Sequence, residues 1–110
     1  MKINVLVLPH IENALAVKLT QIQKDYLLAD GDITWVGGRG NGRTFVHCIR
    51  LVLSKGEPLN IEYPERFSDY GDGSTRYARG HYRTMFMDIW TKLNDYGFTV
   101  RQIKMRNYLD

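Results

Sequence analysis

The stretch Lys2–Gly31, KINVLVLPHIENALAVKLTQIQKDYLLADG, decides the predicted fold class. Apolar side chains fall on both faces of Lys2–Leu8 if this segment is extended, which predicts a strand in the middle of a sheet with layers on either side. Pro9 ends the strand, because proline has no N–H for the ladder and suits the first turn of a helix. Apolar residues then recur every three or four positions over Ile11–Ala29, which predicts one amphipathic helix.

The segment Thr44–Leu53 fits two structures. Its β-branched and aromatic residues favour a strand, whereas the spacing of its apolar residues also fits one face of a helix. We interpret it as a strand that forms a hairpin with a second strand over Leu59–Tyr63. A further helix is predicted over Arg79–Tyr96, where apolar residues again recur at helical spacing. The remaining predictions are a short strand, a surface loop and a last strand, over Ile33–Val36, Pro64–Ser74 and Phe98–Met105.

These elements occur in the order β-α-β-β-β-α-β. We therefore predict a single α+β domain over residues 1–110, with two main helices and a mixed sheet of about five strands. The length of 110 residues suits one domain, and a composition of 44% hydrophobic and 25% charged residues excludes a disordered chain.

The sequence also bears on location. No apolar run approaches the roughly 18 residues of a membrane-spanning helix, and the first residues lack the pattern of a signal peptide, so we expect no membrane partner. Cys48 is the single cysteine and cannot form an internal disulfide, which favours a reducing compartment. We therefore expect a cytoplasmic protein.

The charge is concentrated in two arginine segments. The chain carries 15 Lys and Arg against 12 Asp and Glu, a net charge of +3. Residues 36–56 contain four bases and no acid, and residues 73–87 contain three arginines and no acid. Between them, residues 57–72 contain five acids and one arginine. Arginine binds phosphate and carboxylate groups in a bidentate manner, so the two segments indicate an anionic partner.

The first arginine segment contains a glycine-rich loop. Gly37-x4-Gly42-Arg43-Thr44 matches a phosphate-binding loop except that Arg43 stands where that motif has lysine. The segment after Thr44 is predicted to be a strand, whereas that motif opens a helix, so we do not expect nucleotide hydrolysis. The loop is either a hairpin tip without a ligand or a tip whose Arg39 and Arg43 hold an anion.

The second arginine segment has helical spacing. Arg76, Arg79 and Arg83 stand at i, i+3 and i+7, which places them on one side of a helix. Tyr77 lies among them, and arginines with interleaved aromatic rings are typical of single-stranded nucleic-acid binding. The alternative is that these arginines pair inside the molecule with the acidic segment, whose candidates are Glu62, Glu65, Asp69 and Asp72.

The sequence does not point to a catalytic or metal site. His47 and Cys48 are neighbours, and neighbouring residues of a strand point to opposite faces, so they cannot form a nucleophile and base pair. The three histidines lie on separate elements without the spacing of zinc ligands. We expect no catalytic residue, no metal and no cofactor.

These observations lead to a functional hypothesis. We expect a small non-enzymatic binding protein that binds an anionic partner, with nucleic acid or nucleotide phosphate favoured. The residues expected to bind that partner are Arg39, Arg43, Arg76, Arg79, Arg83 and Tyr77. The alternative is a protein–protein interaction module, such as a small phage or bacterial inhibitor or adaptor, that contacts an acidic protein surface.

Overall fold

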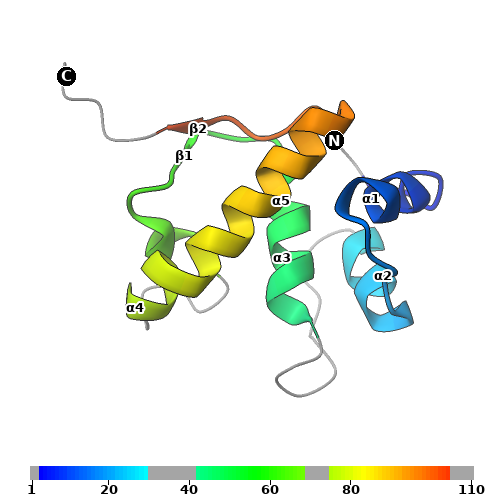
Figure 1. Cartoon of the computed structure of the whole chain (residues 1–110), viewed down its shortest axis with the longest axis horizontal. Helices are drawn as coiled ribbons and strands as arrows, with labels where there is room; N and C mark the ends of the chain where they lie inside the picture. Colours follow the sequence, from blue (N-terminus) through cyan, green and yellow to red (C-terminus); the bar gives the residue numbers. More distant parts are fainter. Residues whose placement is uncertain (1–2, 30–41, 69–74, 105–110) are drawn as a thin grey trace.

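Helices form most of the structure. The computed structural model describes residues 3–29, 42–68 and 75–104. Its elements in chain order are α1 Leu8–Leu15, α2 Gln21–Leu28, α3 Arg43–Val52, β1 Leu59–Asn60, η1 Pro64–Arg66, α4 Thr75–Tyr77, η3 Ala78–Tyr82, α5 Arg83–Tyr96 and β2 Ile103–Lys104 (Figure 1). Here η1 is a 3-10 turn and η3 is a single π-helical turn.

The predicted α+β fold with a mixed sheet of about five strands is wrong. Within the described ranges the only strands are β1 and β2, which pair in parallel with Leu59 opposite Ile103 and Asn60 opposite Lys104. They lie at one end of the molecule, next to the C-terminal ends of α3 and α5 (Figure 1). The predicted last strand over Phe98–Met105 is therefore reduced to β2.

The predicted first strand, Lys2–Leu8, is not a strand over its described residues. The side-chain oxygen of Asn4 accepts hydrogen bonds from the backbone N–H groups of Leu6 and Val7, at 2.9 and 3.2 Å. These bonds fold the backbone into a turn that leads into α1, an alternative that Asn offers the chain in place of a ladder. As a result Leu6 is 81% exposed instead of lying inside a sheet.

The predicted helix Ile11–Ala29 is divided into α1 and α2. The chain leaves α1 at Ala16, whose φ of 54° is left-handed. It enters α2 through a capping box in which Thr20 Oγ1 accepts from the Gln23 N–H at 3.2 Å and Gln23 Oε1 accepts from the Thr20 N–H at 2.9 Å. Glu12 Oε2 spans the break by accepting from the Leu19 N–H at 2.7 Å. The apolar spacing thus predicted helix correctly but missed the break.

The predicted strand Thr44–Leu53 is a helix, α3. Val46, Ile49 and Val52 recur at helical spacing and are fully buried, so burial of this face outweighs the modest preference of β-branched residues for strands. The hairpin with Leu59–Tyr63 is consequently wrong as well. The predicted strand Ile33–Val36 lies outside the described residues.

The predicted helix Arg79–Tyr96 is confirmed, and the helical structure begins earlier. It starts at Thr75 and runs through α4 and η3 into α5. It ends where Gly97 adopts a φ of 111°, a left-handed cap that glycine takes without strain. The predicted surface loop Pro64–Ser74 begins with η1, and its residues 69–74 lie outside the described part of the chain.

The core lies where α5 crosses α3 and α1. Its fully buried members come from these three helices and from η3, and they include Ile11, Val46, Ile49, Val52, Tyr82, Phe86, Ile89 and Leu93. Tyr82 brings a hydroxyl into this core. That hydroxyl donates to the Phe67 carbonyl at 3.3 Å and lies 3.0 Å from His47 Nδ1. Of the described helices, none combines the length and the hydrophobicity needed to cross a membrane.

Candidate anion-binding face

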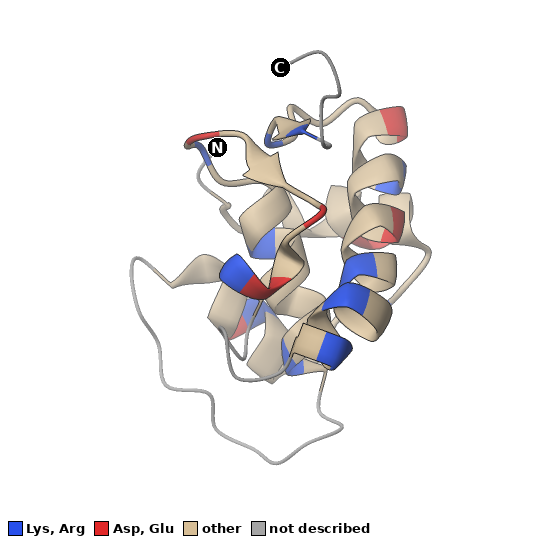
Figure 2. Ribbon diagram, turned by 90° about the vertical axis from the view of Figure 1, so that its left-hand side faces the viewer, with Lys and Arg blue, Asp and Glu red and all other residues tan. Residues whose placement is uncertain are grey.

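The helical segment Thr75–Met87 presents a row of arginines. Ala78, Tyr82 and Phe86, four positions apart, are fully buried and orient the segment against the core. The arginines therefore stand on its outer side, where Arg76, Arg79 and Arg83 are exposed. The segment contains no acid. In Figure 2 the basic residues are concentrated in the N-terminal half of this long helix.

Arg79 is held by an internal partner. Its Nη2 and Nε donate to the two carboxylate oxygens of Glu65, at 2.9 and 3.2 Å. The hydrogen bond from Arg79 keeps the pKa of Glu65 below its ordinary value, and the same bond raises the pKa of Arg79. Internal pairing with the acidic segment, the alternative considered for these arginines, is therefore what the structure shows for Arg79.

Tyr63 lies beside this ion pair. The guanidinium carbon of Arg66 is 5.1 Å from the centre of the Tyr63 ring, and that of Arg79 is 5.5 Å from it. The ring is still 40% exposed. The segment Tyr63–Arg66 thus adds an aromatic surface and a further arginine to the arginines of the helix.

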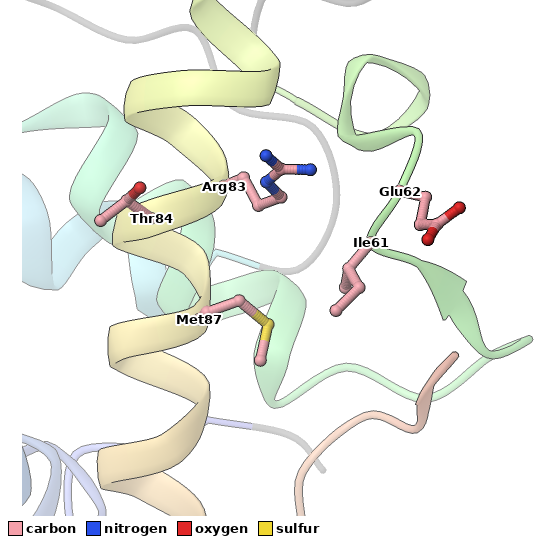
Figure 3. A pocket seen from close by; sticks show the side chains of 5 residues that line it. All are labelled: Ile61, Glu62, Arg83, Thr84 and Met87. Carbon is pink, nitrogen blue, oxygen red and sulfur yellow. The ribbon is translucent and has the colours of Figure 1, made fainter. Parts of the chain in front are cut away.

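A groove separates the helix from the segment that follows β1. Ile61 and Glu62 line one side, Arg83, Thr84 and Met87 line the other, and the volume is about 340 Å³. In Figure 3 the side chains of Met87 and Ile61 point toward each other across it, and the Arg83 guanidinium extends from α5 toward the Ile61–Glu62 segment. Glu62 lies at the outer edge. We name this the α5 groove.

The two arginine segments meet at one point. Thr44 Oγ1, in the first turn of α3, is 3.0 Å from Tyr77 Oη in α4. Arg43, the first residue of α3, therefore lies near the start of the arginine row. The Tyr77 ring is half-buried and contacts the rings of His81 and Tyr82, with centroids 5.8 and 6.1 Å away.

The glycine loop is described only from Gly42 onward. Gly42 precedes α3 with a φ of 77°, and its carbonyl accepts a hydrogen bond from Gln23 Nε2 at 3.4 Å. The helix after Gly42 removes one argument against a phosphate-binding loop, which was the predicted strand. Arg43 still stands in place of the lysine of that motif. The predicted site residue Arg39 lies outside the described residues.

Sequence reasoning missed half of the α5 groove. It identified Arg83 as a site residue but not Ile61, Thr84 or Met87. Tyr63 was predicted to end a strand and Pro64–Arg66 to begin a surface loop. The position of this segment beside α5 depends on the parallel pairing of β1 with β2. Within residues 3–29, 42–68 and 75–104, no three His, Cys, Asp or Glu side chains come together as possible metal ligands.

No protein-family model, no curated protein and no solved structure matches this chain.

Proposed function

We propose that this chain is a non-enzymatic binding protein whose partner is a nucleic acid. The observation that carries the proposal is the acid-free segment Thr75–Met87, a continuous helical segment with its arginines on the outer side. Arg76 and Arg83 are exposed and have no ion-pair partner among the described residues, whereas Arg79 is paired with Glu65. The proposed contacts are therefore Arg76 and Arg83, supported by Arg66, which lies against the Tyr63 ring.

The geometry suits a phosphate backbone. Arg76 and Arg83 are seven positions apart, which at about 1.5 Å per residue separates them by roughly 10 Å along the helix. That distance spans about two to three phosphates of an extended strand. Arg79 lies between them, and its pairing with Glu65 keeps the local charge moderate. We therefore expect an affinity that depends strongly on salt and is modest at physiological ionic strength.

The proposed protein has no catalytic activity, and its proposed location is the cytoplasm. Nδ1 of His47 is engaged by the Tyr82 hydroxyl at 3.0 Å, and the Cys48 side chain is fully buried. A thiol buried in apolar surroundings is a poor nucleophile, because burial disfavours the thiolate. The cytoplasmic location is argued from the single cysteine, which suits a reducing compartment.

The experiment is a salt titration of oligonucleotide binding by fluorescence anisotropy. With about two to four phosphates contacted, log affinity for a single strand should fall against log salt with a slope of about −1.5 to −3. Arg76→Glu and Arg83→Glu should each weaken binding and flatten the slope. Lys18→Glu, the same change of charge on an exposed residue between α1 and α2, is the matched control and should change affinity far less. A flat salt response, or equal effects of all the variants, contradicts the proposal.

One observation favours a second candidate, a protein-interaction module that binds an acidic protein surface. Val5 is 67% exposed and Leu6 is 81% exposed in the turn before α1, and exposed apolar residues that lie together favour protein contacts. This candidate predicts no oligonucleotide binding even at about 50 mM salt. It also predicts that Leu6→Ser removes partner binding while Arg83→Glu weakens it only in part.

A further inference from the structure

We propose that Arg79 also contacts a phosphate group of the bound nucleic acid, and that Glu65 is the residue that positions it for this contact. This inference rests on the proposed function and adds Arg79 to the contacts argued above, Arg76 and Arg83. It follows from the edge of the Arg79 guanidinium that Glu65 occupies, from the exposure of the two side chains and from the charges around them.

Glu65 occupies only one edge of the Arg79 guanidinium. A guanidinium carries five N–H donors in one plane. The Glu65 carboxylate accepts from Nε at 3.2 Å and from Nη2 at 2.9 Å, and these two nitrogens form the side edge of that plane. The two N–H groups of Nη1 and the second N–H of Nη2 have no acceptor among the described residues. The end of the guanidinium, formed by Nη1 and Nη2, can therefore bind a second oxyanion while Glu65 stays in place.

The free end of this guanidinium is accessible to a partner. The Glu65 side chain is only 13% exposed, whereas that of Arg79 is 47% exposed, so the carboxylate lies beneath the guanidinium. Arg79 stands between Arg76 and Arg83, about 4.5 Å from the first and about 6 Å from the second along the helix axis. A phosphate backbone that contacts Arg76 and Arg83 therefore passes Arg79 as well.

The pairing with Glu65 does not neutralise this part of the surface. The guanidinium carbons of Arg66 and Arg79 both lie against the Tyr63 ring, 5.1 and 5.5 Å from its centre. The hydrogen bond from Arg79 is the main cause of the lowered pKa of Glu65, and the positive charge of Arg66 lowers that pKa further. Two guanidinium groups thus accompany one carboxylate, and the excess positive charge attracts a phosphate.

Positioning by Glu65 favours binding because it fixes a flexible side chain in advance. An exposed arginine loses rotamer freedom when it binds a partner, and this loss weakens the affinity. Two hydrogen bonds hold Arg79 before the partner arrives, so Arg79 loses less freedom than an arginine without such bonds. Lysine cannot take this role, because its ammonium is a point charge without two separate planar edges.

The first test measures binding of a fluorescent dT strand of about 12 nucleotides by anisotropy. Glu65→Gln should weaken binding about threefold or more, because Arg79 is no longer fixed by two charged hydrogen bonds. Glu62→Gln is the matched control, since it removes the same charge from the same segment and Glu62 forms no ion pair in the described part of the chain. This control should strengthen binding by up to about twofold. Opposite signs of the two effects distinguish positioning from a change of charge.

The second test changes Arg79, at a temperature well below the melting temperature of every variant. Arg79→Lys keeps the positive charge beside Glu65 but lacks the free planar end, so it should weaken binding about threefold or more. Arg76→Lys should weaken binding less, because no described carboxylate fixes Arg76. Arg79→Gln should reduce the slope of log affinity against log salt by about 0.7, the value for one phosphate of a single strand. A purely structural role of Arg79 would leave this slope unchanged.

Two results overturn the inference. If Glu65→Gln strengthens binding as Glu62→Gln does, Glu65 only competes with the partner for Arg79. If Arg79→Gln leaves the salt slope unchanged, Arg79 contacts no phosphate. In both cases the proposed function stands, provided that the wild type binds the strand in a salt-dependent manner. An absence of binding by the wild type overturns the inference and the proposed function together.

Discussion

Glu65 holds Arg79 by two hydrogen bonds, from Nη2 at 2.9 Å and from Nε at 3.2 Å, so that the two planar groups face each other side by side. Four residues further along the helix, Arg83 has no such partner among the described residues. Arginines that are equivalent by sequence spacing thus differ in role, because the turn η1 reaches only the first of them. Variants of Arg79 and Arg83 can therefore distinguish an effect on the stability of the fold from an effect on partner binding.

Arg79→Glu should lower the melting temperature, whereas Arg83→Glu should leave it nearly unchanged. The first variant places a carboxylate opposite Glu65, and like charges in contact are destabilising. The second removes an exposed charge without an ion-pair partner in the described structure, and such changes usually alter stability by less than about 0.5 kcal/mol. Thermal unfolding at low salt measures both. Equal melting temperatures for the two variants would show that the ion pair has no structural role.

Stability should fall in acid partly through Glu65. Its folded-state pKa lies below the ordinary value of 4.5, so the group binds a proton more readily in the unfolded chain. The stability it contributes is therefore present above pH 4.5 and is lost as the pH falls through the lower folded pKa. Glu65→Gln should be less stable than the wild type at about pH 7, and the difference should shrink toward about pH 3. A difference that stays constant with pH would contradict this.

Elements with strong apolar spacing and a clear end could be predicted from the sequence. The helix Arg79–Tyr96 is the example, since its buried residues recur at helical spacing and Gly97 ends it. Thr44–Leu53 carries the same kind of spacing, but its β-branched residues favoured a strand in the prediction. The burial that decides between these possibilities comes from α5, which is distant in the sequence.

Local side-chain bonds caused the other errors. Asn4 turns a strand-like segment into the entry of α1, and the capping box at Thr20 divides a helix that is continuous by apolar spacing. The arginines of the candidate site were predictable from composition, because charge is visible in sequence. The α5 groove was not, because its second side is brought to α5 by the pairing of Leu59 with Ile103.

Gly42→Ala should destabilise the protein by about 1 to 3 kcal/mol. A φ of 77° costs an alanine roughly 1 to 2 kcal/mol, and the added Cβ would overlap with the buried amide of Gln23. In a Gln23→Ala background the overlap disappears, so the cost of Gly42→Ala should fall to about 1 kcal/mol. Gly80→Ala is the control: its Cβ meets nothing within 4 Å and the position is helical, so it should be neutral or stabilising. Chemical denaturation of the wild type, the two single variants Gly42→Ala and Gln23→Ala and the double variant measures the cycle. Equal costs of Gly42→Ala in both backgrounds would contradict a role for Gln23.

Tyr77→Phe should lower stability by about 1 kcal/mol, because it removes the hydroxyl that lies 3.0 Å from Thr44 Oγ1 while keeping the ring. Thr44→Val should have an effect of similar size, and the double variant should cost less than the sum of the two. Tyr96→Phe, on a tyrosine that is 48% exposed, is the control and should be close to neutral. Additive effects of Thr44→Val and Tyr77→Phe would show that the two hydroxyl groups do not interact.

Tyr63, rather than Tyr77, should be the tyrosine that contacts a nucleic acid. The Tyr77 ring is half-buried between α4 and the core and contacts His81 and Tyr82, so little of it remains for a base. Tyr63 is 40% exposed, follows the groove residue Glu62 in the chain and has the Arg79 guanidinium carbon 5.5 Å from its ring centre. A base stacked on an aromatic ring contributes about 1 to 3 kcal/mol, so Tyr63→Leu should weaken oligonucleotide binding by roughly fivefold or more. Tyr77→Leu, measured well below its lower melting temperature, should change the affinity by less than about twofold. The reverse order of effects would return the stacking role to Tyr77 and place the bound strand on α4, away from the groove.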